Sequence, residues 1–172
     1  YSGRGALDRV LSHAELRARA VSRARRLLGA GLRPGERAVL IGETGPDFPI
    51  TLFACLHAGI VPCIAPAETN VLARDSYLQR IAGIVSICEA SVLLAPAKFD
   101  AAGRVPVRLL RLPDLDALPE ADANLRPARS EEVAYVQFSS GSTTQPKGVL
   151  ISHRALMANV AAILRHGICL TS

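Results

Sequence analysis

The chain has 172 residues, of which 49% are hydrophobic and 20% are charged, and this composition is typical of a globular protein with one sizeable core. The net charge of +5 comes almost entirely from arginine, but only 4% of the residues are aromatic and no stacking platform accompanies the basic residues. A nucleic-acid-binding protein is therefore not expected.

No apolar run approaches the 18 or so residues that a membrane-spanning helix needs, so no membrane span is predicted. The sequence begins at Tyr1 without a methionine and shows no basic, hydrophobic leader, which is typical of a piece of a longer protein. We expect a cytoplasmic location.

The cysteines and histidines do not show the spacing of a metal site. Cys55, Cys63 and Cys88 lie in apolar runs, and Cys169 stands apart near the C-terminus. We expect the first three to be reduced core residues, as cysteines of cytosolic proteins usually are. No metal site is predicted.

The first helix is predicted over Leu11–Leu28, where apolar residues recur at helical spacing. Ser12 and Glu15 form a capping box at its start, and Gly29 follows its end. Five arginines on this helix are interpreted as a solvated polar face: Arg17, Arg19, Arg23, Arg25 and Arg26.

Short apolar strands alternate with helices along the rest of the chain, which predicts an α/β fold with a largely parallel sheet and flanking helices. Pro62 weakens the assignment of one strand, because proline cannot donate to a sheet ladder. Strands are expected at 38–42, 60–66, 91–95 and 108–112, and helices at 48–58 and 74–88. Between Leu112 and Arg129 the sequence turns rich in Pro, Asp, Glu and Ala, and we expect an exposed, irregular linker there.

An apolar strand predicted over Val133–Phe138 ends abruptly in a run of small, hydroxyl-rich residues. Hydroxyls, backbone N–H groups and a lysine on a glycine-containing loop after a strand suit a polyphosphate, although a Ser/Thr-rich surface loop without a ligand is the plainer alternative. The loop does not match a Walker A motif, because Pro stands at its second glycine and Gly at its Mg²⁺-binding hydroxyl. The candidate phosphate-binding residues are Ser139, Ser140, Gly141, Ser142, Thr143, Thr144, Gln145, Pro146, Lys147 and Gly148.

A last helix is predicted from Ser152, a good N-cap, to about Leu164. His153, at its start, could face a ligand or serve the entrance of the helix. We favour the second role, because the first turn of a helix commonly recruits polar side chains.

Ser139–Gly148 resembles the phosphate-loop signature of the adenylate-forming superfamily, which comprises acyl-CoA synthetases, fatty acyl-AMP ligases and adenylation domains of peptide synthetases. Two scaffold motifs of that superfamily are similar to Leu11–Leu16 and Leu56–Pro62, and Ser152-His153 with Asn159 is similar to the segment after its phosphate loop. One position departs from the signature, since Thr144 stands where most members have Gly. That departure, with the Val136-Gln137-Phe138 lead-in, looks more like the fatty acyl-AMP ligase branch.

The resemblance implies that residues 1–172 are the N-terminal fragment of an AMP-binding domain. Its parent would use ATP and Mg²⁺ to convert a carboxylic acid, most naturally a fatty acid, into acyl-AMP and pyrophosphate. It would then deliver the acyl group to a carrier protein or to coenzyme A. The groups that hold adenine, ribose and the acyl chain, and the catalytic residues, are expected downstream of Ser172, so the fragment alone is predicted to be inactive.

Three alternatives remain open at this stage. Two lie in the same superfamily: a fatty acyl-CoA ligase and a peptide-synthetase adenylation domain. The third is a non-catalytic nucleotide-binding or interaction module that keeps the fold without turnover.

Overall fold

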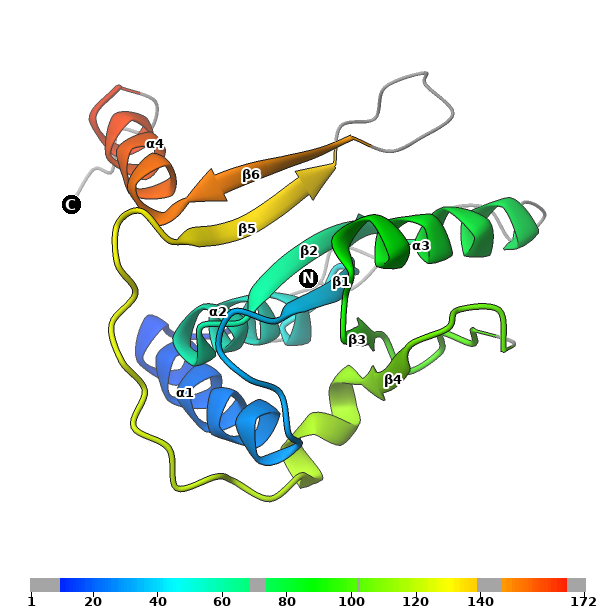
Figure 1. Ribbon diagram of the computed structural model, residues 1–172. Helices are drawn as coiled ribbons and strands as arrows, with labels where there is room; N and C mark the ends of the chain where they lie inside the picture. The colour runs from blue at the N-terminus through cyan, green and yellow to red at the C-terminus, as the bar shows by residue number, and fades with distance from the viewer. Residues whose placement is uncertain (1–9, 69–73, 102, 139–146, 167–172) are drawn as a thin grey trace.

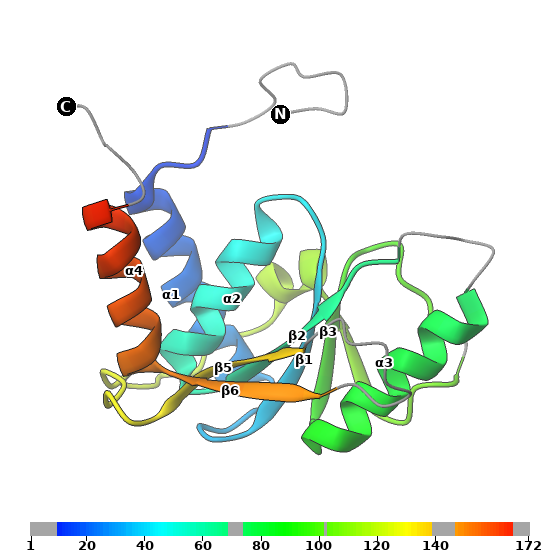
Figure 2. The same ribbon diagram turned by 90° about the horizontal axis from the view of Figure 1, so that it is seen from above.

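The computed structural model describes residues 10–68, 74–101, 103–138 and 147–166. It is a six-stranded sheet in the order β4-β3-β1-β2-β5-β6 with helices on both faces (Figures 1 and 2). All neighbouring strands are parallel except β5 and β6, which confirms the predicted α/β class. The elements are α1 (His13–Gly29), β1 (Arg37–Gly42), α2 (Asp47–Ala58), β2 (Val61–Pro66), α3 (Arg74–Cys88), β3 (Val92–Ala95), β4 (Arg108–Arg111), the 3₁₀ helix η2 (Leu112–Ala117), β5 (Val133–Phe138), β6 (Gly148–Ser152) and α4 (His153–His166).

The central strands bury side chains on both faces, so the domain has two apolar cores. Successive residues of a strand point to opposite faces. Accordingly, Val39 and Ile41 of β1 pack with α3, whereas Ala38 and Leu40 pack with α1 and α2. Figure 2 shows the same division, with α3 on one side of the sheet and α1 and α2 on the other. This double covering explains why the strand sequences are nearly continuously apolar.

The predicted helix starts at the two ends of the chain are confirmed by their caps. The Ser12 hydroxyl accepts a hydrogen bond from the Glu15 amide at 3.1 Å, and the Ser152 hydroxyl accepts one from the Ala155 amide at 3.2 Å. Each bond satisfies an amide that the first helical turn leaves without a backbone partner.

Pro62 lies in β2 as predicted, and its position explains how a proline fits there. The Val61 amide donates to the Glu36 carbonyl beside β1 at 2.8 Å. Because successive amides of a strand point to opposite sides, the Pro62 nitrogen faces the β5 side, where it has no hydrogen to donate. The paired residues of β2 and β5 begin only one position later, with Cys63↔Val136 and Ile64↔Gln137.

The prediction of an exposed, irregular linker between Leu112 and Arg129 is wrong for the first part of that segment. Residues 112–117 form η2, and Leu112 and Leu115 are buried against the α1 and α2 side of the sheet. Farther along, Glu120 accepts a hydrogen bond from the Ser22 hydroxyl at 2.7 Å and pairs with Arg26 at 3.1 Å. Two leucines with the spacing of a single tight turn are enough to anchor a segment whose composition is otherwise that of a loop.

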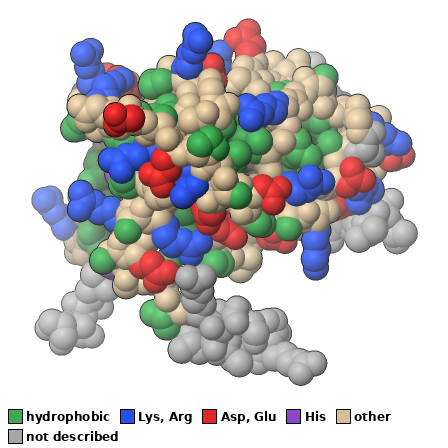
Figure 3. Space-filling view, turned by 90° about the horizontal axis from the view of Figure 1, so that it is seen from below, with side chains coloured by type: hydrophobic (Ala, Val, Ile, Leu, Met, Phe, Trp, Pro, Cys, Tyr) green, Lys and Arg blue, Asp and Glu red, His purple; other side chains and the backbone are tan. Residues whose placement is uncertain are grey.

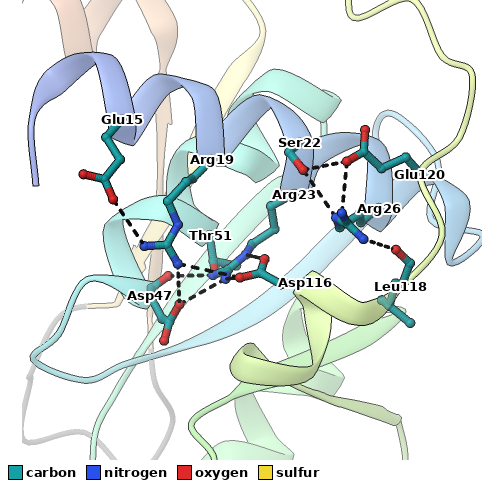
Figure 4. A network of polar contacts seen from close by, with 10 residues as sticks. All are labelled: Glu15, Arg19, Ser22, Arg23, Arg26, Asp47, Thr51, Asp116, Leu118 and Glu120. Carbon is teal, nitrogen blue, oxygen red and sulfur yellow. Dashed lines mark hydrogen bonds and ion pairs between the residues drawn. The ribbon is translucent and has the colours of Figure 1, made fainter.

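The interpretation of the α1 arginines as a solvated face is also wrong for Arg23, whose side chain is 0% exposed. Its guanidinium contacts Asp47 at 3.0 Å, Asp116 at 2.8 Å and the Thr51 hydroxyl at 2.9 Å (Figure 4). Arg19 lies 3.8 Å and 3.6 Å from the same two carboxylates. A buried guanidinium is tolerated only with such partners, so this network fixes α1, α2 and η2 relative to one another.

Six further arginines also pair with carboxylates, which limits the local effect of the positive net charge: Arg26, Arg37, Arg74, Arg104, Arg126 and Arg154. On the face shown in Figure 3, Lys and Arg side chains are interspersed with Asp and Glu rather than gathered in one patch. Among the helices that the structure describes, none is both long and apolar enough to cross a membrane.

The Arg23 network yields a test of stability. Replacing Arg23 with Ala removes a buried cation and leaves Arg19, at 3.6–3.8 Å, as the described ion-pair partner of Asp47 and Asp116, so the free energy of unfolding should fall by roughly 2–4 kcal/mol. Arg25→Ala is the matched control, because Arg25 is exposed on the same helix and its loss should change stability by no more than about 0.5 kcal/mol. Urea unfolding followed by circular dichroism measures both changes. Equal stabilities of the two variants would contradict the assigned role of Arg23.

Candidate phosphate-binding site

The candidate phosphate loop joins the two strands of an antiparallel hairpin. Phe138 at the end of β5 is paired with Gly148 at the start of β6, so the intervening residues leave and re-enter the sheet at one point. Of the predicted site residues, Ser139–Pro146 lie outside the described residues, whereas Lys147 and Gly148 are described. Lys147 is exposed and directly precedes β6, so its cation lies at the carboxyl end of β5.

Gly148 is required here for close packing. A Cβ atom at this position would lie 2.9 Å from Val136 Cγ1 and 3.2 Å from Phe138 Cε1, closer than ordinary side-chain contacts. Gly148 is not among the described glycines with positive φ, so a left-handed backbone is not the reason for glycine here. Its missing side chain instead lets β6 lie tightly against the side chains of β5 and so fixes where Lys147 enters the sheet.

Two further strands end beside β5, and the carboxyl ends of the three strands together form what we call the carboxyl edge of the sheet. β1 ends at Gly42 and β2 at Pro66, and both run parallel to β5 within the sheet. Ligands of open α/β sheets bind beyond the carboxyl ends of the strands. The edge formed by β1, β2 and β5 is therefore where the fold would place a ligand of the loop.

Tyr77 ties α3 to this edge. Its hydroxyl donates a hydrogen bond to the Pro66 carbonyl at 3.0 Å, and its ring meets Phe99 edge-on with centroids 6.4 Å apart. Burial raises the pKa of Tyr77 to about 12, and the carboxylates of Glu68 and Glu43 act in the same direction. The phenol therefore stays protonated at neutral pH and serves as a fixed hydrogen-bond donor.

Glu43 and Glu68 are two acidic residues at this edge that sequence reasoning missed. Each follows the end of a strand, β1 and β2 respectively, and that position was the signal that could have revealed them. Oε1 of Glu68 is buried and has no hydrogen-bond partner among the described residues. Within the described part of the chain, no three His, Cys, Asp or Glu side chains come together to hold a metal ion.

A cavity of about 360 Å³ lies at the amino-terminal ends of β2 and β5, opposite the carboxyl edge, where the two strands diverge before their pairing begins. Its walls include Val61, Val133 and Leu125 together with His57 and His153. His153 begins α4, and its amide donates to the Glu132 carbonyl at 3.0 Å. Because β6 runs antiparallel to β5, His153 lies at the other end of the hairpin from Lys147, which supports its structural interpretation.

His57 does not lie at the carboxyl edge either. Burial, with a smaller contribution from the Arg17 charge, lowers the pKa of His57 below its usual value. A largely neutral imidazole is the form that a partly apolar wall favours. The structure thus places both histidines away from Lys147 and Gly148, the described residues of the predicted site.

The chain is similar to several known proteins. A family model described as AMP-binding enzyme matches residues 3–171. A Caulobacter vibrioides protein, provisionally named an acyl-CoA synthetase, is 40% identical over 98% of this chain, and a feruloyl-CoA synthase from Amycolatopsis is 35% identical over 90% of it. A solved structure from a study of fatty acyl-adenylate ligases of E. coli and L. pneumophila superimposes with a TM-score of 0.90, at 35% identity over 98% of this chain.

These relatives are much longer than the chain. It spans 30% of the length of each of the two synthetases and 31% of the solved chain. The match is therefore to one part of each relative, and it includes the segment that carries the candidate loop.

The packing of Gly148 gives a test at the site itself. Gly148→Ala forces a methyl group against Val136 and Phe138, and the resulting overpacking should cost about 1–3 kcal/mol of stability. Gly83→Ala is the control, because Gly83 lies within α3 with nothing within 4 Å of its added Cβ. That variant should be unchanged or up to about 1 kcal/mol more stable, since alanine favours helix. Thermal unfolding measures both, and an unaffected Gly148→Ala variant would contradict the packing argument.

Proposed function

The chain belongs to the AMP-binding enzyme family, and on this basis we propose that it is the N-terminal part of a ligase that activates a carboxylic acid with ATP. The observation that carries the proposal is the position of the residues that flank the candidate loop: Phe138 and Lys147-Gly148 lie at the carboxyl end of β5, in a largely parallel sheet and within the matched region. Residues 1–172 would form an N-terminal portion of the AMP-binding domain, with residues 139–148 as its phosphate loop.

The proposed reaction begins with attack of a carboxylate oxygen on the α-phosphorus of ATP. A bond forms between that oxygen and the α-phosphorus, the bond to the bridging oxygen breaks, and pyrophosphate leaves with the β- and γ-phosphates. The task of this part of the chain would be to hold the leaving group and stabilise its growing charge. Loop hydroxyls and amides of Ser140–Thr144 would donate hydrogen bonds, and Lys147 would neutralise charge.

Mg²⁺ would accompany the nucleotide. This ion is commonly bound by substrate phosphates together with one or two carboxylates, and it neutralises phosphate charge when bound. Glu43 and Glu68 are carboxylates at the carboxyl edge that could supply such oxygens, and one Glu68 oxygen has no hydrogen-bond partner among the described residues.

We propose a fatty acid as the substrate and a carrier-protein thiol as the acyl acceptor. Support comes from Thr144-Gln145 in the loop and from the likeness to the fatty acyl-adenylate ligase structure. A second candidate is an acyl-CoA ligase, which the names of the two synthetase relatives favour. The two candidates share the first half-reaction and differ in the thiol that accepts the acyl group.

The role of Lys147 can be tested in the complete parent enzyme. Lys147→Ala should slow adenylation by a factor corresponding to about 1–3 kcal/mol, because charge-assisted hydrogen bonds to the departing pyrophosphate are lost. Lys98→Ala, which removes the only other lysine of the chain from an exposed position, should leave the rate unchanged. Pyrophosphate exchange measures both. Equal rates for Lys147→Ala and the unchanged enzyme would refute the assignment.

The acceptor is tested by incubating the parent with ATP and a fatty acid in the presence of coenzyme A. If the enzyme is a fatty acyl-AMP ligase, acyl-AMP should accumulate and coenzyme A should remain unacylated, as mass spectrometry of the products would show. Efficient formation of acyl-CoA would establish the second candidate and leave the proposed first half-reaction intact.

Residues 1–172 alone should not catalyse adenylation. A few charge-assisted hydrogen bonds of about 1.5–3 kcal/mol each must first offset an association cost of at least about 4 kcal/mol, so ATP should bind at best in the millimolar range. No described residue is assigned to hold the carboxylate in line with the α-phosphorus. Pyrophosphate exchange above background by the purified 172-residue chain would show that the active site has been placed wrongly.

A further inference from the structure

The cavity at the amino-terminal ends of β2 and β5 has no part in the proposed reaction, although several elements converge to form it. Its volume is about 360 Å³. α1 contributes Leu28, the end of α2 and the turn after it contribute residues 56–60, and α4 contributes His153. Another wall comes from the irregular segment between η2 and β5, which runs past α1 and α2 in Figure 1. The cavity is therefore enclosed by parts of the chain that are far apart in the sequence.

Large apolar side chains line this cavity, and the protein itself buries them only in part. They are Leu28, Leu56, Val61, Leu125 and Val133. The space stays open because the paired residues of β2 and β5 begin only with Cys63↔Val136. An apolar ligand would remove more of the lining from water and would supply the dispersion contacts that the lining atoms lack. An apolar cavity of about 150 Å³ holds one benzene molecule, so this one has room for a bicyclic molecule.

The two oppositely charged side chains of the lining neutralise each other. Arg126 donates hydrogen bonds to the two Glu132 oxygens at 2.7 Å and 3.2 Å, and the Arg129 amide donates to the same carboxylate at 3.0 Å. The hydrogen bond from Arg126 is the main cause that lowers the pKa of Glu132 to about 2, so the pair persists at neutral pH. Neither side chain offers a free charge to a ligand. Because a charged group is costly to desolvate without a partner, the lining favours an uncharged ligand.

Hydrogen-bonding groups on the lining come from His57, His153 and Asn124. A neutral imidazole has one N–H donor and one acceptor nitrogen. Within the described part of the chain, no hydrogen bond joins either imidazole to another side chain. A hydroxyl group can donate to such a nitrogen or accept from it, so a hydroxyl is the polar group that matches these walls.

We propose that this cavity binds a small, uncharged aromatic alcohol of the size of a bicyclic phenol. Its rings would lie against the leucine and valine side chains, and its hydroxyl would be hydrogen-bonded to an imidazole of the lining. A rigid ring system fits better than a flexible chain, because it has little conformational freedom to lose on binding. The site lies opposite the carboxyl edge, and the proposal does not depend on the proposed ligase activity.

Titration of the ¹⁵N-labelled chain with 2-naphthol at neutral pH tests the proposal. The amide resonances of Val61, Leu125, Val133 and His153 should shift in a saturable way, with a Kd of about 1 mM or less, and those of Lys147-Gly148 should not. Naphthalene, which lacks the hydroxyl, should bind about 2–12-fold more weakly, as expected for the loss of one hydrogen bond. The anion 2-naphthoate should bind about tenfold more weakly or worse, because its charge finds no free partner on the walls.

Two matched variants test the place of binding. Val133→Phe puts a larger side chain into the cavity and should weaken binding of 2-naphthol by about tenfold or more. Val149→Phe is the control, because Val149 is exposed on β6 and does not line the cavity, so the affinity should stay the same. Circular dichroism checks that both variants fold.

The comparison of the three ligands uses the unchanged chain and so decides the matter even if Val133→Phe does not fold. Three results would each overturn the proposal. They are the absence of saturable shifts around the cavity, binding of 2-naphthoate or naphthalene as tight as that of 2-naphthol, and an unchanged affinity in folded Val133→Phe.

Discussion

The attachment of β5 to β2 is the contact on which the candidate site depends. Two register pairs, Cys63↔Val136 and Ile64↔Gln137, join the β5–β6 hairpin to the remaining four strands. The hairpin carries the candidate loop, whereas β1 and β2 carry Glu43 and Glu68 beyond their ends. Without this short ladder the loop and the carboxylates would belong to separate parts of the sheet. Pro62 limits the ladder at its amino-terminal side, where the cavity with the two histidines opens.

The packing of the helices on the remaining four strands depends on apolar burial and on the buried cation of Arg23. Alternate residues of the central strands face two different apolar cores. Burial of apolar surface stabilises the fold by about 25 cal/mol per Å². Apolar contacts alone do not specify how α1 meets α2 and η2. The buried Arg23, with its fixed set of oxygen partners, supplies that specificity by making other packings leave a charge without a partner.

The features predicted well from the sequence are those that short stretches encode. α3 was predicted to the residue over 74–88, because its apolar positions recur at helical spacing, and both serine caps were found from their position before a helix. The features that were missed depend on distant partners. Arg23 looked like one of five surface arginines because Asp116, which buries it, lies 93 positions away. β6 was not predicted as a strand. Most of its residues are exposed, and its strand structure comes from its pairing with β5. The ten candidate loop residues were found by motif, and their geometry between Ser139 and Pro146 stays a prediction.

The central claim is that polyphosphate binds at the carboxyl edge of the sheet, and titration of the ¹⁵N-labelled chain with pyrophosphate tests it most directly. The account predicts that amide resonances of Phe138, Lys147 and Gly148 shift in a saturable way at millimolar pyrophosphate. Those of His57 and His153, at the opposite edge, should stay in place. Saturable shifts centred on the two histidines, or no shift at Lys147 and Gly148, would contradict the account.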